Sequence, residues 1–87
     1  MKNVGKEFSS LRSVLGYSQE DVCGILQMSR GALGKLEKSQ DIEDISYNSA
    51  FRMYYFAMKI LEKSDVKDFI KLQAKKIKEL AEERIAL

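Results

Sequence analysis

The sequence predicts an all-α protein, and three observations lead to this prediction. None of its 87 residues is a proline. Apolar residues recur every three or four positions, which is the period of a helix, and they nowhere alternate with polar residues as in a half-buried strand. The breaks between these periodic segments fall at glycine, serine and acidic residues, the types that cap or end helices. We therefore expect five helices and no sheet.

The first helix is expected over residues 4–15. Its apolar positions share one helical face, and they are Phe8, Leu11, Val14 and Leu15. Gly16 follows directly and is placed to end the helix, because glycine readily adopts the left-handed backbone that follows many helix ends.

Residues 18–37 predict two short helices whose connection is too tight for anything but a helix-turn-helix. Ser18 is expected to cap the first of them, with Asp21 three residues on in the position of a capping-box carboxylate. The apolar face of that helix is Val22, Cys23, Ile25 and Leu26. Ser29 is expected to cap the second helix. Such a pair of helices usually binds DNA.

The second helix of this pair is expected to present a polar outer face. Its apolar positions are Ala32, Leu33 and Leu36. That spacing leaves an outer face made of Arg30, Gly31, Gly34 and Lys35. Two cations and two glycines on this face suit entry into a DNA major groove. Each glycine costs roughly 1 kcal/mol relative to alanine, so the pair marks either a functional surface or a tolerance of poor helix formers at exposed sites.

The fourth helix is expected over residues 46–62. One apolar stripe runs along it, formed by Ala50, Met53, Tyr54, Ala57, Ile60 and Leu61. Further apolar residues lie off that stripe, namely Phe51, Tyr55, Phe56 and Met58. The helix should therefore pack on two sides, with its second face against the last helix or another subunit.

The last helix is expected to begin with Ser64 as its cap and Asp65 in its first turn, and to continue to the chain end. Its apolar stripe is Val66, Phe69, Ile70, Ala74, Ile77, Leu80, Ala81, Ile85 and Leu87. The lysines between these positions are expected to form a solvated face, with a secondary DNA contact as the alternative.

The length of this helix predicts a dimer. About 23 helical residues extend roughly 35 Å, which is more than a small core needs for cover. Part of the stripe is therefore expected to be shared between protomers, through Phe69, Ile70, Ile77 and Leu80. On this view residues 1–62 form the helix-turn-helix unit and residues 63–87 the dimerisation helix, and Ile77→Glu should give a folded monomer.

Eleven positions along the first three helices fit one recurrent pattern: Arg12, Gly16, Ser18, Gln19, Val22, Cys23, Leu26, Ser29, Leu33, Leu36 and Glu37. In this spacing the chain resembles the Xre or phage-repressor type of helix-turn-helix regulators. The resemblance covers residues 6–61. It implies a five-helix phage-repressor-like domain with an extended C-terminal amphipathic helix, and a structural ion pair between Arg12 and Glu37.

The resemblance also implies where DNA would be contacted: Gln19, Ser29, Arg30, Gly31, Gly34, Lys35 and Lys38. Gln19 corresponds to the family's phosphate-contacting residue, at a helix N-terminus that favours an anion, with a solvated glutamine as the alternative. Arg30 would form a two-pronged contact with guanine O6 and N7, or else hold a phosphate and read no base.

Three features depart from the family pattern. Gln27 stands in the turn where glycine is usual, and we expect it to adopt a left-handed backbone. Ser39 stands where glycine is common, two residues after the closing glutamate. The loop at residues 40–44 contains three acidic residues, where family members often have basic or neutral groups that touch phosphates. This loop favours the alternative of a protein-interaction module that has lost DNA binding.

The composition leaves little for catalysis. The chain has no histidine and one cysteine, and it lacks a glycine-rich phosphate loop. We therefore expect neither an enzyme nor a cofactor or metal site, and we interpret Cys23 as a packed thiol. The net charge of +2 neither requires nor excludes nucleic acid. Since the first fifteen residues contain four charges and no long apolar run, we expect a cytoplasmic protein without a membrane segment.

Together these features predict a dimeric, sequence-specific regulator of transcription that binds double-stranded DNA at a palindromic operator, most simply as a repressor. Two alternatives remain open. One is an antitoxin-like DNA-binding protein whose C-terminal helix captures a protein partner. The other is the interaction module without DNA binding.

Overall fold

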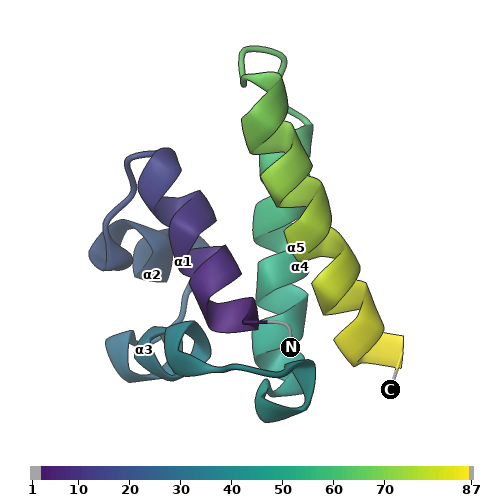
Figure 1. Cartoon of the computed structure of the whole chain (residues 1–87). Coiled ribbons are helices and arrows are strands. Elements are labelled where there is room, and N and C mark those ends of the chain that lie inside the picture. The colour runs from purple at the N-terminus through teal and green to yellow at the C-terminus, as the bar shows by residue number, and fades with distance from the viewer. Residues whose placement is uncertain (1–2, 87) are drawn as a thin grey trace.

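The chain folds into five α-helices and one short 3-10 helix in a computed structural model, which describes residues 3–86. The elements in order are α1 (Val4–Val14), α2 (Gln19–Leu26), α3 (Arg30–Lys38), η1 (Ile42–Asp44), α4 (Tyr47–Leu61) and α5 (Asp68–Ala86). No strand occurs within these described residues, so the all-α prediction is confirmed. Figure 1 shows α4 and α5 running antiparallel along each other, with α1, α2 and α3 on one side of this pair.

The start of α2 is set by the predicted capping box. The Ser18 hydroxyl accepts a hydrogen bond from the Asp21 N–H at 3.0 Å, and the Asp21 carboxylate accepts one from the Ser18 N–H at 2.9 Å. Donation to the Asp21 carboxylate, first by the Ser18 backbone N–H and then by the Ser18 side chain, lowers the pKa of Asp21 below its ordinary 3.8. The capping contribution to stability is therefore complete at neutral pH and is lost only as the pH falls through that lowered pKa.

Serine also caps α3 and α4. The Ser29 hydroxyl accepts from the Ala32 N–H, and the Ser46 hydroxyl accepts from the Ser49 N–H, each at 3.1 Å. The predicted start of the fourth helix is thus confirmed, as is the end of the first, where Gly16 has a φ of +80°.

The predicted start of the last helix is wrong. Helix α5 begins at Asp68, and residues 62–67 form the connection that reverses the chain direction after α4. The Lys67 carbonyl accepts the first two helical hydrogen bonds, from the Ile70 and Lys71 N–H groups at 3.0 and 3.1 Å. Ser64 lies within this connection and does not cap the helix. Val66, in the same connection, packs partly against the core.

One hydrophobic core joins all five helices. Its aromatic centre is Phe56 of α4, whose ring centroid lies 5.3 Å from that of Phe8 and 6.1 Å from that of Tyr17. The buried apolar residues are Val4, Phe8, Leu11, Val22, Leu26, Leu33, Leu36, Ile42, Ile45, Ala50, Met53, Phe56, Ala57, Ile60, Ala74, Ile77, Leu80 and Ala81. Residues from both predicted segments, 1–62 and 63–87, thus contribute to this core.

The C-terminal stripe does not offer the dimer surface that we expected. Ile77 and Leu80 are 0% and 5% exposed within the single chain, because α5 packs against both α4 and α1. Ile70 is half-buried, and only Phe69 of the expected set is well exposed. The substitution Ile77→Glu would therefore place a charge in the core, where it disrupts folding rather than association.

The second face of α4 is only partly covered. Phe56 is buried, but Phe51 and Tyr55 remain about half exposed, at 55% and 49%. The prediction that the fourth helix packs on two sides is thus confirmed for Phe56, whereas Phe51 and Tyr55 are only partly covered within the chain.

Candidate functional site

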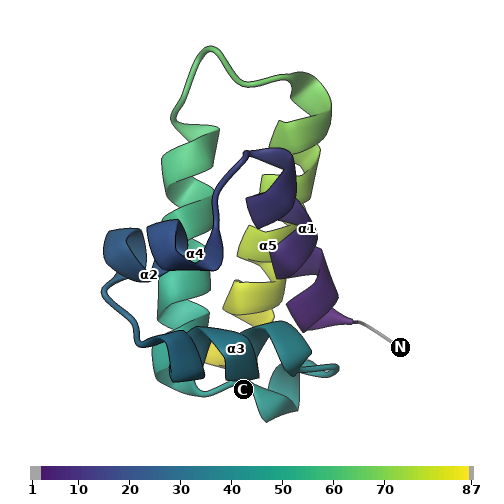
Figure 2. The same ribbon diagram turned by 90° about the vertical axis from the view of Figure 1, so that its left-hand side faces the viewer.

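The candidate site is the outer face of α3 together with the turn that positions it. Helix α2 ends at Gln27, which has the left-handed backbone we predicted, with φ 54° and ψ 48°. Ser29 then caps α3, so only residues 27–29 separate the two helices. In Figure 2, α3 lies across the lower end of the α4 and α5 pair.

An arginine from α4 holds this turn. The Arg52 Nε donates to the Leu26 carbonyl at 3.0 Å, and its Nη2 donates to the Gln27 carbonyl at 3.4 Å. Both carbonyl groups belong to the C-terminal end of α2, where a cation is also favoured by the helix dipole. Arg52 was not among the predicted residues, because a lone arginine beside an apolar stripe gives no sign of a contact 26 residues away.

Four of the predicted contact residues on α3 are exposed, namely Arg30, Gly31, Lys35 and Lys38, and Gly34 is partly exposed. All five line one shallow hollow of about 650 Å³, together with Ser39 and Asp44. The prediction that Ala32 faces inward is wrong, since it is exposed. Leu33 and Leu36 are the buried apolar residues of α3 and anchor it to the core.

The fold itself does not require either glycine of α3. A Cβ atom at Gly34 would meet nothing within 4 Å, and one at Gly31 would meet only the Ser29 hydroxyl at 4.0 Å. Both residues have ordinary helical backbone, so no positive φ calls for glycine. Each glycine costs a helix roughly 1 kcal/mol of stability relative to alanine. Nothing within the chain therefore explains why glycine stands at these two positions.

Gln19 and Ser29 are not part of this hollow. The Gln19 side-chain amide donates to the Glu37 carboxylate at 2.8 Å, which directs it toward the end of α3. The Ser29 hydroxyl is occupied by its cap hydrogen bond, although the residue is exposed.

An ion pair fixes α3 against α1. The Arg12 Nε lies 2.7 Å from the Glu37 Oε2, and its Nη2 lies 3.3 Å from Oε1. The Arg12 Nη1 donates to the Tyr17 carbonyl at 2.9 Å, so the guanidinium also secures the connection to α2. The two side chains are only 14% and 9% exposed. The predicted pair is thus present, and Gln19 extends it to α2.

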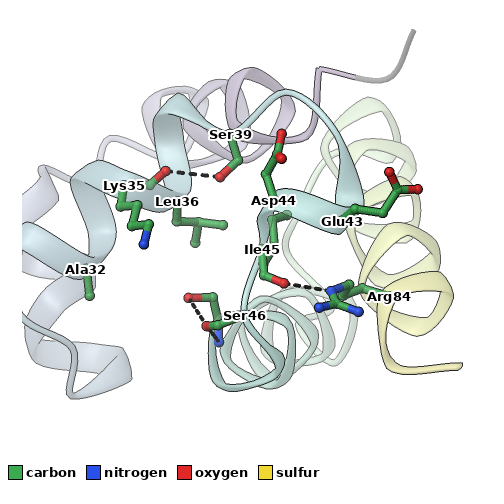
Figure 3. Close-up of a pocket in the computed structure, with 10 residues that line it drawn as sticks. Ala32, Lys35, Leu36, Ser39, Glu43, Asp44, Ile45, Ser46 and Arg84 are labelled. Atoms are coloured by element: carbon green, nitrogen blue, oxygen red, sulfur yellow. Dashed lines mark hydrogen bonds between the residues drawn. The ribbon is translucent and has the colours of Figure 1, made fainter. Parts of the chain in front are cut away.

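A second hollow of about 330 Å³ lies behind α3 (Figure 3). Lys35 lines one side of it and Arg84 of α5 the other. The Arg84 Nε donates to the Ile45 carbonyl at 2.6 Å, and the guanidinium lies 4.4 Å from the Tyr47 ring centroid. Arg84 therefore holds the loop that follows α3, much as Arg52 holds the turn that precedes it.

The acidic loop borders the α3 face. Asp44 lines both hollows, and its carboxylate accepts from the Asp41 N–H at 3.2 Å, so it also stabilises η1. Glu43 is exposed beside it. These carboxylates place negative charge at the Lys35 and Lys38 end of α3, whereas Arg30 lies at the opposite end.

No protein-family model matches the chain, and comparison with curated proteins and with solved structures likewise gave no match. Residues 3–86 contain no cluster of three or more acidic or cysteine side chains that could bind a metal ion. Within the same part of the chain, no helix has the length and apolar character needed to cross a membrane.

Proposed function

We propose that the protein is a sequence-specific DNA-binding regulator of transcription that inserts α3 of a helix-turn-helix into the major groove. The observation that carries this proposal is the exposed face with Arg30, Lys35 and Lys38 around two glycines that the fold does not require. A helix without side chains at two surface positions can approach a base edge closely. The family resemblance of residues 6–61 supports the same function.

The cations of this face have different roles in the proposed complex. Arg30 is the first residue of α3, as expected for a helix that reads bases with its N-terminal residues. Its planar guanidinium can form two hydrogen bonds with guanine, whereas Lys35 offers a compact charge that suits a phosphate. The acidic side chains next to Lys35 and Lys38 weaken phosphate contacts at that end of α3. Phosphate contacts carry no sequence information, so in the proposed complex Arg30 carries most of the specificity.

Arg30→Ala should relax specificity, with a loss of about 1 to 3 kcal/mol on the specific duplex and much less on a scrambled one. Lys35→Ala should weaken both complexes similarly and reduce the salt dependence by about one ion. Binding isotherms on both duplexes, at several salt concentrations, measure these effects. The control is Lys75→Ala, which removes an exposed charge from α5. Equal losses on both duplexes for Arg30→Ala would exclude base reading by this residue.

Gly34→Ala should distinguish two explanations for glycine on α3: close approach to DNA at this position, or tolerance of a poor helix former at an exposed site. The substitution should raise the free energy of unfolding by roughly 1 kcal/mol, because alanine is the better helix former and its Cβ has open space. If α3 lies against DNA at this point, operator affinity should fall at least severalfold despite the gain in stability. Gly24→Ala on α2 is the matched control, since a Cβ there also meets nothing within 4 Å. If Gly34→Ala binds DNA as tightly as the wild type, the glycine is explained only by tolerance of a poor helix former at an exposed position.

The proposed regulator acts as a homodimer on a palindromic operator, and repression follows if the operator overlaps a promoter. The second candidate is a protein-interaction module, favoured by the carboxylates of Glu43 and Asp44 beside α3. Selection of bound sequences from a random duplex pool distinguishes the two candidates. An enriched palindrome supports the regulator, and the absence of any enrichment supports the interaction module.

A further inference from the structure

An aromatic row on the outer side of α4 is only half covered: the Arg84 guanidinium of α5 lies over the Tyr47 ring and the Lys59 Nζ lies over the Tyr55 ring, but no helix packs over the row. Tyr47, Phe51 and Tyr55 follow one another at intervals of four residues and are 48%, 55% and 49% exposed. Ile25 of α2, which is 43% exposed, adjoins Phe51 and Tyr55 across a hollow of about 320 Å³. We call these four residues the α4 face. In Figure 2, α4 lies on the left of the molecule, whereas α1 and α5 lie on the right.

The α4 face is large enough to form the centre of an interface. A tyrosine or phenylalanine buries about 150 to 250 Å² when fully covered, so each half-exposed ring leaves roughly 100 Å² of surface in water. Three rings and Ile25 together give on the order of 400 Å². Two such faces provide roughly 800 Å², about half of a stable interface of standard size, with the remainder supplied by the polar rim.

We propose that a second copy of the chain docks on the α4 face, with the two α4 helices antiparallel and the two-fold axis at Phe51. In this register Phe51 meets its own copy, and Tyr47 of each protomer lies opposite Tyr55 of the other. An isologous contact of this kind needs one self-complementary surface, which a row of three aromatic residues centred on phenylalanine provides. Antiparallel helices also place opposite dipole ends together.

The charges at the two ends of α4 complement each other in this arrangement. Glu43 and Asp44 precede the helix, and the cations that line the same hollow are Lys35 and Arg84, of which Arg84 already binds the Ile45 carbonyl. Lys59 and Lys63 lie at the other end, against Glu62. A two-fold axis at Phe51 therefore brings the acidic end of one protomer to the basic end of its partner. Glu43 and Lys59 are equidistant from Phe51 in sequence, so they form the closest expected pair.

The α4 face replaces the C-terminal stripe as the proposed dimer surface. Ile77 and Leu80 are buried inside the chain, and the exposed apolar pair on α5, Phe69 and Leu72, is smaller than the α4 face. The inference names the surface of the homodimer in the proposed function. Association can be measured without DNA, so failure of the surface and failure of DNA binding are separate results.

The first test compares two phenylalanines of similar exposure, Phe51 at 55% and Phe69 at 52%. Sedimentation equilibrium of the full chain, from about 1 to 100 µM, should show a dimer for the wild type and for Phe69→Glu. Phe51→Glu should be a folded monomer, with unchanged helical circular dichroism, because its side chain faces water in the single chain. A wild type that remains monomeric at 100 µM, or dissociation by Phe69→Glu and not by Phe51→Glu, would overturn the proposal.

The second test concerns the antiparallel register. Glu43→Lys and Lys59→Glu should each weaken dimerisation about tenfold, since each places like charges together at both ends of the interface. The double variant restores opposite charges and should recover most of the wild-type affinity. Additive weakening in the double variant would contradict this register, whatever the role of Phe51.

Discussion

Gly5→Ala is expected to destabilise the protein by about 3 kcal/mol or more, because there is no room for one methyl group. The first turn of α1 packs directly on the backbone at the end of α3. A Cβ atom at Gly5 would lie 2.6 Å from the Leu36 carbonyl oxygen and closer still to the carbonyl of Glu37. These atoms belong to the helix backbone, so they cannot move aside as a flexible side chain would.

The contact around Gly5 also includes hydrogen bonds. The Gly5 N–H donates to the Ser39 carbonyl at 2.9 Å, and the Val4 N–H donates to the Gln40 carbonyl at 3.1 Å. Two free N–H groups of α1 are thus satisfied by the chain that leaves α3. Forcing the helices apart to admit a Cβ would lengthen both bonds, which adds to the steric cost.

Urea denaturation measures this effect, with Gly24→Ala as the comparison. Gly24 is exposed on α2, and a Cβ there meets nothing within 4 Å, so alanine should add roughly 1 kcal/mol of stability. The same substitution should therefore have opposite signs at the two positions. If Gly5→Ala were as stable as the wild type, the close packing of α1 on α3 would be refuted.

The features predicted correctly from the sequence are mostly local ones. The Ser18 and Ser29 caps depend on atoms three residues away, and the left-handed backbone of Gln27 was expected because the residue stands in the turn where the resembled family usually has glycine. The helical periodicity of the apolar residues likewise defines α1 to α4 within a residue or two. Such hydrogen bonds and patterns are determined by neighbouring residues, so they can be recognised before the fold is known.

The features that the sequence did not reveal depend on how the helices pack. A continuous apolar stripe on the last helix looks the same whether a second protomer or α1 and α4 cover it, and burial of Ile77 and Leu80 decides in favour of the latter. The contacts of Arg52 and Gly5 join residues more than 20 positions apart. The long-range pair of Arg12 and Glu37 was predicted only because the chain resembles a family that has it.

Glu37→Gln is expected to cost about 3 to 5 kcal/mol, because it leaves the Arg12 charge in a mostly buried site without its counter-charge. The carboxylate accepts hydrogen bonds from Arg12 and Gln19 and is 9% exposed. In a domain of this size the loss should lower the Tm by more than about 12 °C. Thermal and urea denaturation of the variant measure it directly.

A surface ion pair of the same chain provides the control. Lys76 and Glu7 lie 3.0 Å apart, but their side chains are 57% and 35% exposed. Glu7→Gln should therefore cost less than about 1 kcal/mol, and its effect should largely disappear in 1 M salt, where the screening length is only about 3 Å. The cost of Glu37→Gln should persist in that salt, since water and ions have little access to the pair.

A double-mutant cycle separates the pair from its surroundings. Arg12→Gln alone leaves Glu37 with only the Gln19 amide, so it should be about as destabilising as Glu37→Gln. The double variant has no unpaired charge, and its loss should be well below the sum of the two single losses. An unchanged Tm for Glu37→Gln, or strictly additive losses, would contradict a coupled buried pair. Because this pair joins α1, α2 and the end of α3, it acts together with Arg52 and the Gly5 contact to fix the orientation of the α3 face.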